Sequence, residues 1–307
     1  MEKKDLVKSG LRKNWVSVFA MFAGIMMASF LNHTAQAGET ITIAGSSTVK
    51  PIVEEAVLAF KKGNPGVQVV VGGGGSSGGV KNAGEGKVDI GMASRKIKEK
   101  EQKTYPDLLP VVIGQDGVAM IVNKSLAIDN ITTEQIFKIY TGAVTNWKEL
   151  GGKDLPISLV GILLHHGTAE VFMKFVGLEG EERGEGTKKT ICYWKKNGER
   201  KCVLEARGVD GNQPSCAAVM TKPGAVSFAS IGFATSLADK GAPVKLLKLN
   251  GVEPTSANVV SGAYPLSRPL LVMTKGEARG GVKKFIDYLL SVDGQAIVRN
   301  KDFIPVK

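Results

Sequence analysis

A run of glycine and serine residues between a predicted strand and a predicted helix constrains this chain more than any other feature. Residues 67–71 are valine except for Gln68, which favours a strand. Residues 72–79 are all glycine or serine, and a polar helical segment follows them. Such a loop leaves backbone N–H groups and hydroxyls free at the positive end of a helix, where small anions bind. A mobile glycine linker is the alternative, which the flanking strand and helix disfavour.

The first 37 residues have the pattern of a secretory signal peptide. Basic residues precede an apolar run at residues 15–31, and Ala35-Gln36-Ala37 supplies a small-x-small cleavage site. An uncleaved membrane anchor is the alternative, although the run is slightly short for a bilayer span. No cysteine lies at the cleavage site, where residue 38 is glycine, so a lipid anchor is not expected. We expect a soluble protein exported to the periplasm, with a mature chain that begins near Gly38.

The charge and composition of the chain favour a small anionic ligand over a nucleic acid. The formal net charge is +11, and the chain stays basic when the leader is removed. Aromatic residues make up only 6% of the chain, and no basic stripe is interleaved with them. A basic balance of this kind fits a small anion or a negatively charged surface.

Three cysteines make one disulfide and one free thiol the simplest expectation. Cys192 and Cys202 flank a turn containing Asn197-Gly198, which favours a tight hairpin, so we expect them to pair in an oxidising compartment. Cys216 is then left over, although the sequence alone does not fix the connectivity. The spacing fits no zinc pattern, and adjacent histidines usually diverge, so neither a metal nor a cofactor is predicted.

Alternating strands and helices predict an α/β lobe at the start of the mature chain, and the remaining length predicts a second lobe. The charged, glycine-rich segment 177–207 reads as an irregular excursion that contains the cysteine hairpin. The predicted strands are 40–44, 67–71, 88–93, 109–113, 118–122, 156–160 and 225–228, and the predicted helices are 51–60, 80–85, 132–139, 168–176, 217–220 and 282–290.

Hydroxyl and glycine residues gather at three predicted helix starts. These are Gly45-Ser46-Ser47-Thr48, Ser76-Ser77-Gly78-Gly79 and Gly167-Thr168. At any one of them a hydroxyl can simply cap the helix by accepting from its first N–H groups. Three such starts in one α/β chain favour an anion site built where helix ends converge.

Further motifs, taken in order, resemble those of periplasmic phosphate-binding proteins, the soluble components of phosphate ABC importers. The resemblance covers nearly all of the mature sequence. Besides the helix starts, it rests on Ala93-Ser94-Arg95, Asp116-Gly117, Tyr140-Thr141-Gly142, Asn146-Trp147, Pro223-Gly224-Ala225, Tyr264-Pro265-Leu266-Ser267-Arg268-Pro269-Leu270 and Gly294-Gln295.

The resemblance implies an α/β fold of the type II periplasmic-binding-protein class, with two lobes and a ligand cleft between them. It implies that residues 38–117 and 266–307 form lobe 1 and residues 118–265 form lobe 2. It also implies that a monomer captures phosphate and delivers it to an ABC importer permease at the inner membrane, without nucleic acid as a partner.

Carried over by position, the resemblance implies a set of phosphate-binding residues. A carboxylate that accepts the proton of hydrogen phosphate discriminates against sulfate, and some relatives have an aspartate where this chain has Arg95. Asp116 is the replacement we predict, and a turn cap beside Gly117 is the alternative. The predicted ligand-binding residues are Ser46, Ser47, Thr48, Ser76, Ser77, Gly78, Ser94, Arg95, Asp116, His166, Gly167 and Thr168.

The chain departs from the family pattern in lobe 2. Relatives usually read Arg-x-x-x-Ser-Gly-Thr there, whereas this chain has Ile162 in place of the arginine and His166 in place of the serine. Losing a charge-assisted arginine contact costs roughly 1.5–3 kcal/mol. A protonated His166 would restore part of that charge at acidic pH. The alternative is that His165 and His166 are only polar residues on the surface of a loop.

Two other classes of function compete with phosphate capture. The altered lobe 2 motif and the excursion 177–207 favour a relative that has lost tight ligand binding and serves as a surface, adhesion or signalling protein. An enzyme is not predicted, because no metal-ligand set and no nucleophile beside a base can be recognised.

Overall fold

Strands and helices alternate along the described part of the chain. The computed structural model describes residues 39–306, so the predicted signal peptide lies outside the described residues. The strands are β1 (Glu39–Gly45), β2 (Val67–Gly74), β3 (Ile90–Ala93), β4 (Leu108–Asn123), β5 (Asn130–Ile131), β6 (Ser158–Ile162), β7 (Leu178–Arg183), β8 (Thr190–Lys195), β9 (Glu205–Val209), β10 (Ala225–Ser230), β11 (Val244–Leu246), β12 (Lys248–Leu249) and β13 (Ser267–Lys275). The α-helices are α2 (Lys50–Gly63), α3 (Gly75–Gly84), α4 (Glu99–Thr104), α5 (Thr133–Tyr140), α6 (Gly167–Val176), α7 (Asn212–Thr221), α8 (Ile231–Asp239), α9 (Ser256–Val260), α10 (Gly280–Leu290) and α11 (Val292–Asn300), and the 3-10 turns are Trp147–Leu150 and Gly186–Lys188.

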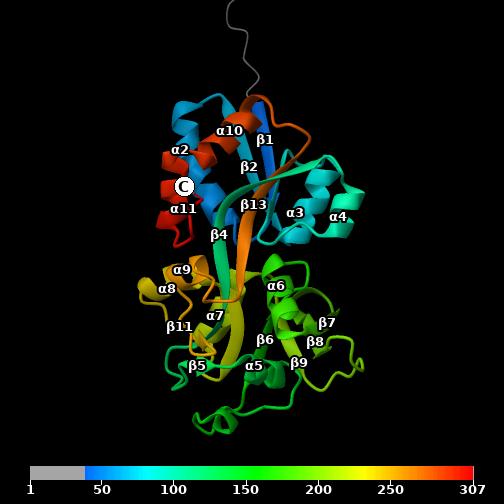
Figure 1. Cartoon of the computed structure of the whole chain (residues 1–307), viewed down its shortest axis with the longest axis vertical. Helices are drawn as coiled ribbons and strands as arrows, with labels where there is room; N and C mark the ends of the chain where they lie inside the picture. The colour runs from blue at the N-terminus through cyan, green and yellow to red at the C-terminus, as the bar shows by residue number, and fades with distance from the viewer. Residues whose placement is uncertain (1–38, 307) are drawn as a thin grey trace, which may run out of the picture. The chain divides into compact units, whose positions relative to one another are not determined.

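The strands β4 and β13 join two lobes (Figure 1). They pair with each other in antiparallel register, from Ser267 opposite Gly117 to Lys275 opposite Leu108. On one side β13 pairs with β3, and on the other β4 pairs with β10, so the sheet continues from one lobe into the next. We call the described residues before β4 and after β13 lobe 1, and those between the two strands lobe 2.

The prediction of two strands at residues 109–113 and 118–122 is wrong, because both belong to the one strand β4. Its antiparallel partner β13 keeps hydrogen-bonding along it, with one register shift between Leu270 and Leu271. A long shared strand pair is well suited to act as a hinge, since it passes between lobes without a break.

Each lobe has its own hydrophobic core. The core of lobe 1 includes Ile43, Phe60 and Phe285, and the rings of Phe60 and Phe285 meet edge to face 5.2 Å apart. The core of lobe 2 includes Phe172 and Phe228, whose rings stack 4.0 Å apart. Two packed cores hold each lobe rigid on either side of the hinge strands.

The glycine-serine run is not a loop, which corrects the prediction of a helix that starts at Val80. Strand β2 continues to Gly74, and α3 begins at Gly75, so the serines lie in the first turn of the helix. Gly74 and Gly75 have φ angles of 110° and 68°, which few residues other than glycine adopt. A Cβ on Gly79 would lie 2.2 Å from the carbonyl oxygen of Met92. The glycines therefore turn the chain sharply and let α3 pack directly on β3.

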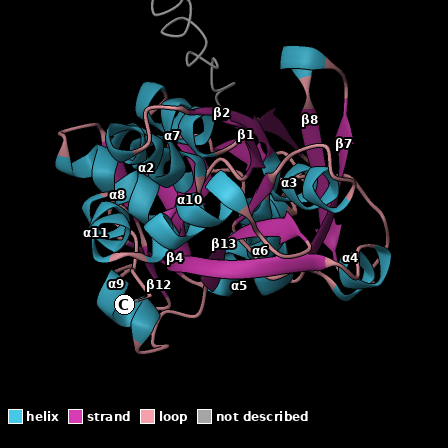
Figure 2. Cartoon of the chain, turned by 90° about the horizontal axis from the view of Figure 1, so that it is seen from above, coloured by secondary structure: helices cyan, strands magenta, loops and turns pink. Residues whose placement is uncertain are grey.

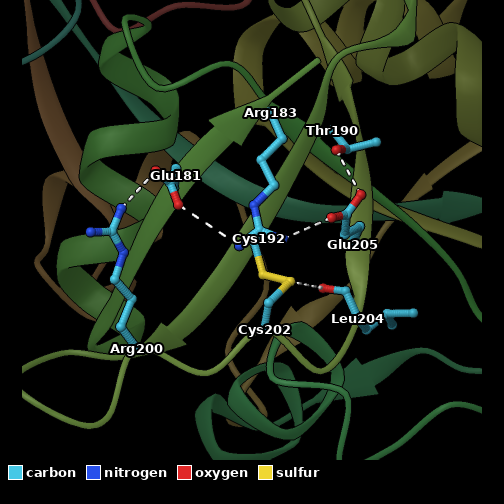
Figure 3. The surroundings of a disulfide bond; sticks show 8 residues. All are labelled: Glu181, Arg183, Thr190, Cys192, Arg200, Cys202, Leu204 and Glu205. Atoms are coloured by element: carbon cyan, nitrogen blue, oxygen red, sulfur yellow. Dashed lines mark hydrogen bonds and ion pairs between the residues drawn. A yellow bond between two sulfur atoms is a disulfide. The ribbon is translucent and has the colours of Figure 1, made fainter.

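The excursion 177–207 is regular structure, which corrects the prediction of an irregular segment. Strands β7 and β8 form an antiparallel hairpin (Figure 2). Strand β8 pairs with β9, which joins the sheet beside β6. A disulfide joins Cys192 on β8 to Cys202 (Figure 3). Cys216 is a buried free thiol on α7. Charged residues such as Glu181, Arg183 and Glu205 lie on these strands and form ion pairs near the disulfide. Because they are charged, the segment lacks the apolar alternation by which a strand is recognised in a sequence.

Among residues 39–306, no helix is long and apolar enough to cross a membrane.

Candidate functional site

The carboxyl ends of four strands point at the boundary between the lobes. In lobe 1, β1 pairs in parallel with β3, and in lobe 2, β6 pairs in parallel with β9. The residues that follow these strands are Ser46, Ser94, Leu163 and Asp210. Ligands of α/β proteins bind at such strand ends. The boundary between the lobes is therefore the candidate site.

The first helix start, after β1, is only partly free for a ligand. The hydroxyl of Ser46 accepts from the N–H groups of Thr48 and Val49, at 3.2 and 3.3 Å, so Ser46 stabilises the turn that leads into α2. The Ser47 hydroxyl lies 3.3 Å from Nδ1 of His166 in lobe 2. The Thr48 hydroxyl is buried and lies 3.4 Å from that of Thr168. Ser47 and Thr48 thus face lobe 2, whereas the Ser46 hydroxyl is engaged in the turn before α2.

The second helix start brings Ser76 against Ser94. The Ser76 hydroxyl accepts from the backbone N–H of Ser94 at 3.0 Å, and the two hydroxyl oxygens are 3.4 Å apart. The backbone N–H of Ser77 donates to the carbonyl oxygen of His165 across the cleft, at 3.1 Å. Gly78 is the exception, because no atom lies within 4 Å of where its Cβ would be. Gly78 is therefore on an open side of α3.

The third helix start, in lobe 2, lies against the second. A Cβ on Gly167 would lie 2.5 Å from the Ser76 hydroxyl oxygen and 3.0 Å from that of Ser94. Only glycine lets α6 approach lobe 1 so closely. Its first N–H groups have no acceptor within the helix and carry partial positive charge. The three helix starts of the sequence prediction therefore do meet at one place.

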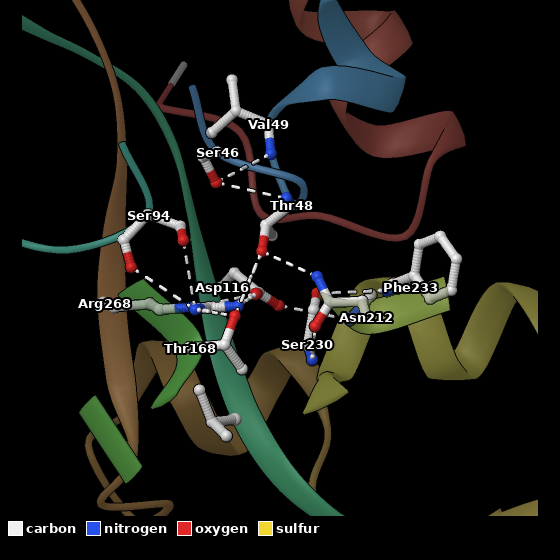
Figure 4. A network of polar contacts seen from close by, with 12 residues as sticks. Ser46, Thr48, Val49, Ser94, Asp116, Thr168, Asn212, Ser230, Phe233 and Arg268 are labelled. Atoms are coloured by element: carbon white, nitrogen blue, oxygen red, sulfur yellow. Dashed lines mark hydrogen bonds and ion pairs between the residues drawn. The ribbon is translucent and has the colours of Figure 1, made fainter. Parts of the chain in front are cut away.

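An arginine that the sequence prediction did not assign lies at the centre of this cluster (Figure 4). Arg268 reaches from β13, and its side chain is almost fully buried. Its Nη1 donates to the hydroxyls of Thr168 and Ser94, at 2.8 and 3.2 Å, and its Nη2 donates to the Thr48 hydroxyl at 3.2 Å. One guanidinium thus binds hydroxyls of both lobes.

Asp116 holds this arginine in place. One carboxylate oxygen accepts from Nε and Nη2 of Arg268, at 3.1 and 2.7 Å, and the other accepts from the backbone N–H of Gly232. Burial lowers the pKa of Arg268, and the charge of Asp116 opposes that shift. A guanidinium stays protonated in proteins. Asp116 therefore positions a buried cation, and its oxygens are already engaged, contrary to the expectation that it accepts a proton from the ligand.

Asn212, at the start of α7, is the second residue that the sequence prediction missed. Its side-chain N–H donates to the Thr48 hydroxyl at 2.9 Å, while its carbonyl oxygen accepts from the N–H of Ser230. An arginine inside a strand of buried apolar residues was the available signal for Arg268. Asn212 had no comparable signal, because polar residues at helix starts are common.

Arg95 lies at the edge of the cluster. Its guanidinium binds both carboxylate oxygens of Glu101, at 2.6 and 2.8 Å. Its Nε is 2.8 Å from the carboxylate of Glu170 in lobe 2, an ion pair without the alignment of a hydrogen bond. Nη2 also donates to the Ser77 hydroxyl at 3.3 Å. Arg95 therefore ties the lobes together, with its charge balanced by two carboxylates.

His166 is buried, with 4% of its surface exposed, so the interpretation of a surface residue is wrong for it. Its Nε2 lies 2.6 Å from a carboxylate oxygen of Asp210. Burial lowers the pKa of His166, and the hydrogen bond to Asp210 opposes this shift. The neutral ring that donates from Nε2 to Asp210 leaves Nδ1 to accept from the Ser47 hydroxyl.

The expectation that the two adjacent histidines diverge is also wrong. The ring centroids of His165 and His166 are 4.2 Å apart, and both Nε2 atoms approach Asp210. Ile162, in contrast, is completely buried in the core of lobe 2. The residue in the position of the family arginine thus stabilises lobe 2 and offers no charge to the cleft.

The cluster as a whole combines one buried cation, converging helix starts and hydroxyls from both lobes. Hydroxyls and N–H groups bind an oxyanion through several hydrogen bonds without a full charge on each donor. One of these hydroxyls, that of Ser47, also contacts the imidazole of His166 at 3.3 Å. The donors of the cluster suit the binding of a compact anion.

Comparisons with known proteins agree with this class of site. The model of the PBP superfamily domain matches residues 32–293. The phosphate-binding protein PstS of Bacillus subtilis is 34% identical, over 100% of this chain and 95% of its own length. The PstS of Borreliella burgdorferi is 27% identical, over 87% and 90%. The chain belongs to the PBP superfamily, among the PstS phosphate-binding proteins.

Solved structures give the same result for the fold. A putative phosphate ABC transporter substrate-binding protein with bound phosphate from Clostridium perfringens has a TM-score of 0.75 and 34% identity, and the match covers 88% of this chain and 100% of that one. An ABC-type phosphate transport receptor from Vibrio cholerae has a TM-score of 0.65 and 29% identity, with coverage of 87% and 100%. The prediction of a two-lobe periplasmic-binding-protein fold is confirmed.

Proposed function

We propose that this protein captures inorganic phosphate between its lobes and delivers it to an ABC importer. The observation that carries the proposal is the buried Arg268 guanidinium, which donates to hydroxyls of Thr48, Ser94 and Thr168 beside converging helix starts. The relatives named above are phosphate-binding proteins, which supports phosphate as the anion.

The closed cleft suggests how the anion is bound. The hydroxyls of Thr48 and Thr168 lie 3.4 Å apart across the boundary between the lobes. Within lobe 1, the hydroxyls of Ser76 and Ser94 are also 3.4 Å apart. An entering oxyanion replaces these hydroxyl contacts with stronger, charge-assisted hydrogen bonds. The lobes open and close about β4 and β13, so that the bound anion loses its water on closure.

The same proposal covers the setting of the protein. The division proposed from the sequence gives β13 and the first part of β4 to the first lobe of a monomer, which then comprises residues 38–117 and 266–307, while residues 118–265 form the second. The protein is exported to the periplasm after removal of residues 1–37, binds its ligand without catalysis, and meets a permease at the inner membrane. The family supports these steps, since its members include substrate-binding proteins of phosphate ABC transporters.

Isothermal titration calorimetry with phosphate, arsenate and sulfate tests the proposal. We expect phosphate to bind at one site, and Ser76→Ala to weaken it about tenfold through loss of a hydroxyl. Ser125→Ala is the matched control, because Ser125 is exposed beyond the lobe 2 end of β4 and its hydroxyl donates to Asn123. No binding of any of these anions near neutral pH, by a folded protein, would contradict phosphate capture.

A second function is favoured by one observation. Ile162 lies in the core of lobe 2, so the position of the family arginine gives the cleft no charge. A relative that keeps the fold but has lost tight binding, and acts as a surface, adhesion or signalling protein, fits that loss. Micromolar phosphate affinity that Ser76→Ala reduces counts against this second function.

A further inference from the structure

Three potential metal ligands meet on the lobe 2 side of the cleft. They are the imidazoles of His165 and His166 and the carboxylate of Asp210, and one ligand atom from each lies within 4.8 Å of the others. The histidines belong to the loop between β6 and α6, and Asp210 belongs to the loop between β9 and α7. All three come from one lobe, so closure of the cleft is not needed to assemble them.

The sheet holds the two loops together. Ile162 at the end of β6 is in register with Val209 at the end of β9. The N–H of Leu163 then donates to the carbonyl oxygen of Val209 at 3.0 Å. A Cβ on Gly211 would lie 3.2 Å from Cε1 of His166, so glycine leaves room for the ring. Backbone pairing, rather than the side chains themselves, thus brings the three groups together.

One of the two distances between donor atoms is close to that of a tetrahedral cation site, and the other must lengthen on binding. Zinc bonds of about 2.0–2.2 Å to nitrogen and oxygen place neighbouring donor atoms roughly 3.3–3.6 Å apart. Nε2 of His165 is 3.2 Å from the Asp210 oxygen, and Nε2 of His166 is 2.6 Å from it. Asp210 is 71% exposed, so its carboxylate is free to move outward from the hydrogen-bonding distance to a bonding distance.

The surroundings leave space for the remaining coordination positions. His166 and Asp210 line a cavity of about 290 Å³, together with Ser47, Lys50 and Glu54. The charge of Lys50 is offset by Glu54, whose carboxylate is 3.5 Å from its ammonium group. A cavity of this size with polar walls accommodates waters that complete a coordination sphere.

We propose that His165, His166 and Asp210 form a binding site for a divalent transition-metal cation of the Zn²⁺ class. Two imidazole nitrogens and a carboxylate oxygen are ligands that Zn²⁺, Co²⁺, Ni²⁺ and Cu²⁺ accept, whereas Mg²⁺ prefers oxygen ligands alone. The competing interpretation is that Asp210 only accepts a hydrogen bond from His166 and so positions Ser47.

Titration of the purified protein with Co²⁺ and Zn²⁺ in phosphate-free buffer tests the site. Co²⁺ reports tetrahedral coordination through its visible absorption, and calorimetry gives the stoichiometry of Zn²⁺. We expect one site, no response to Mg²⁺, and a melting temperature that rises with Zn²⁺. His165→Gln and Asp210→Asn should each weaken Zn²⁺ binding at least about tenfold, since even partners beyond the ligands change affinity by that much.

Asp129→Asn is the matched control, because Asp129 is an equally exposed carboxylate that pairs with Lys245 far from the histidines in sequence and fold. It should leave Zn²⁺ binding unchanged. Absence of Zn²⁺ binding, or binding that His165→Gln and Asp210→Asn do not weaken, would overturn the site and favour the positioning role of Asp210. Circular dichroism checks that each variant is folded.

Phosphate calorimetry without metal separates this inference from the proposed function. A protein that binds Zn²⁺ but no phosphate supports the metal site and contradicts phosphate capture. A protein that binds phosphate but no Zn²⁺ supports phosphate capture and contradicts the metal site.

Discussion

Two buried arginines, Arg95 and Arg268, differ in what neutralises them. Arg95 lies at the edge of the cleft, where Glu101 and Glu170 surround it and are themselves partly exposed. Arg268 lies at the centre, with Asp116 on one side and the hydroxyls of both lobes on the other. Arg95 thus links the two lobes through an ion pair with Glu170 at the edge of the cleft. Arg268 directs its N–H groups at the hydroxyls inside the cleft. The role of each arginine therefore follows from the groups that surround it in the structure, and its position in a sequence motif does not reveal that role.

The position of the family arginine in lobe 2 supplies no cation to the cleft. Ile162 occupies that position and packs in the core. The cation at the centre of the cleft, Arg268, lies on β13, a strand of the hinge. Its partner Asp116 lies directly opposite on β4, so the ion pair joins the two hinge strands to each other.

Replacing Arg268 with methionine is expected to have the largest effect. It leaves Asp116 charged, buried and without its partner, which costs about 3–5 kcal/mol of unfolding free energy. Arg95→Met is the matched variant, and we expect a smaller loss of roughly 1–3 kcal/mol, because its carboxylates turn toward water. Urea unfolding followed by circular dichroism measures both. Equal losses would remove the distinction between the two arginines.

The double variant Asp116→Asn with Arg268→Met sharpens this test. An amide in place of the unpaired carboxylate should recover part of the stability lost in Arg268→Met. No recovery would mean that the guanidinium stabilises the fold mainly through its hydroxyl partners.

Arg268→Lys should separate charge from geometry in the cleft. Lysine keeps the positive charge but loses the planar fork that reaches Thr48, Ser94 and Thr168 together. We expect phosphate affinity to fall by roughly ten- to a hundredfold, and Arg95→Lys to change it less than about threefold. Calorimetry with phosphate measures both variants. A larger effect from Arg95→Lys would make Arg95 the principal ligand residue after all.

Glu170→Gln tests the ion pairs that link the two lobes at the edge of the cleft. Glu170 pairs with Arg95 and Lys98 of lobe 1, each at 2.8 Å, and its removal frees the lobes to separate. We expect a loss of about 1 kcal/mol or less in stability, since these side chains are partly exposed. Small-angle scattering should show a larger radius of gyration for the ligand-free variant. Glu134→Gln, which alters only a pair within α5, should leave the radius unchanged.

Acid should weaken the ion pair of Glu101 with Arg95 at the edge of the cleft. Burial alone would raise the pKa of Glu101, but the hydrogen bonds and charge of Arg95 lower it overall. A carboxyl with a lowered pKa stabilises the fold above its unfolded pKa, about 4.3, and loses that contribution as the pH falls through the lowered value. The melting temperature should therefore fall less steeply from pH 7 to pH 3 in Glu101→Gln than in the parent protein. An identical decline would exclude Glu101 as a contributor.

Much of the fold could be predicted from local patterns. The apolar spacing in α2 and the start of α6 lie where the pattern predicts them, because helix periodicity depends on neighbouring residues. Helix α3, in contrast, begins at Gly75, five residues before its predicted start. The pattern failed at β4, where a partner strand from the far end of the chain makes two predicted strands into one. It failed again at residues 177–207, where charged side chains cover paired strands.

The sequence by itself determined the family, the basic character of the chain and the residues at the helix starts, since each depends on identity or local order. Only the tertiary structure decided that Arg268 meets Thr48 from 220 positions away, that Asp116 binds this arginine, and that both histidines face Asp210. Long-range contacts follow from strand pairing and core packing, which no short motif contains.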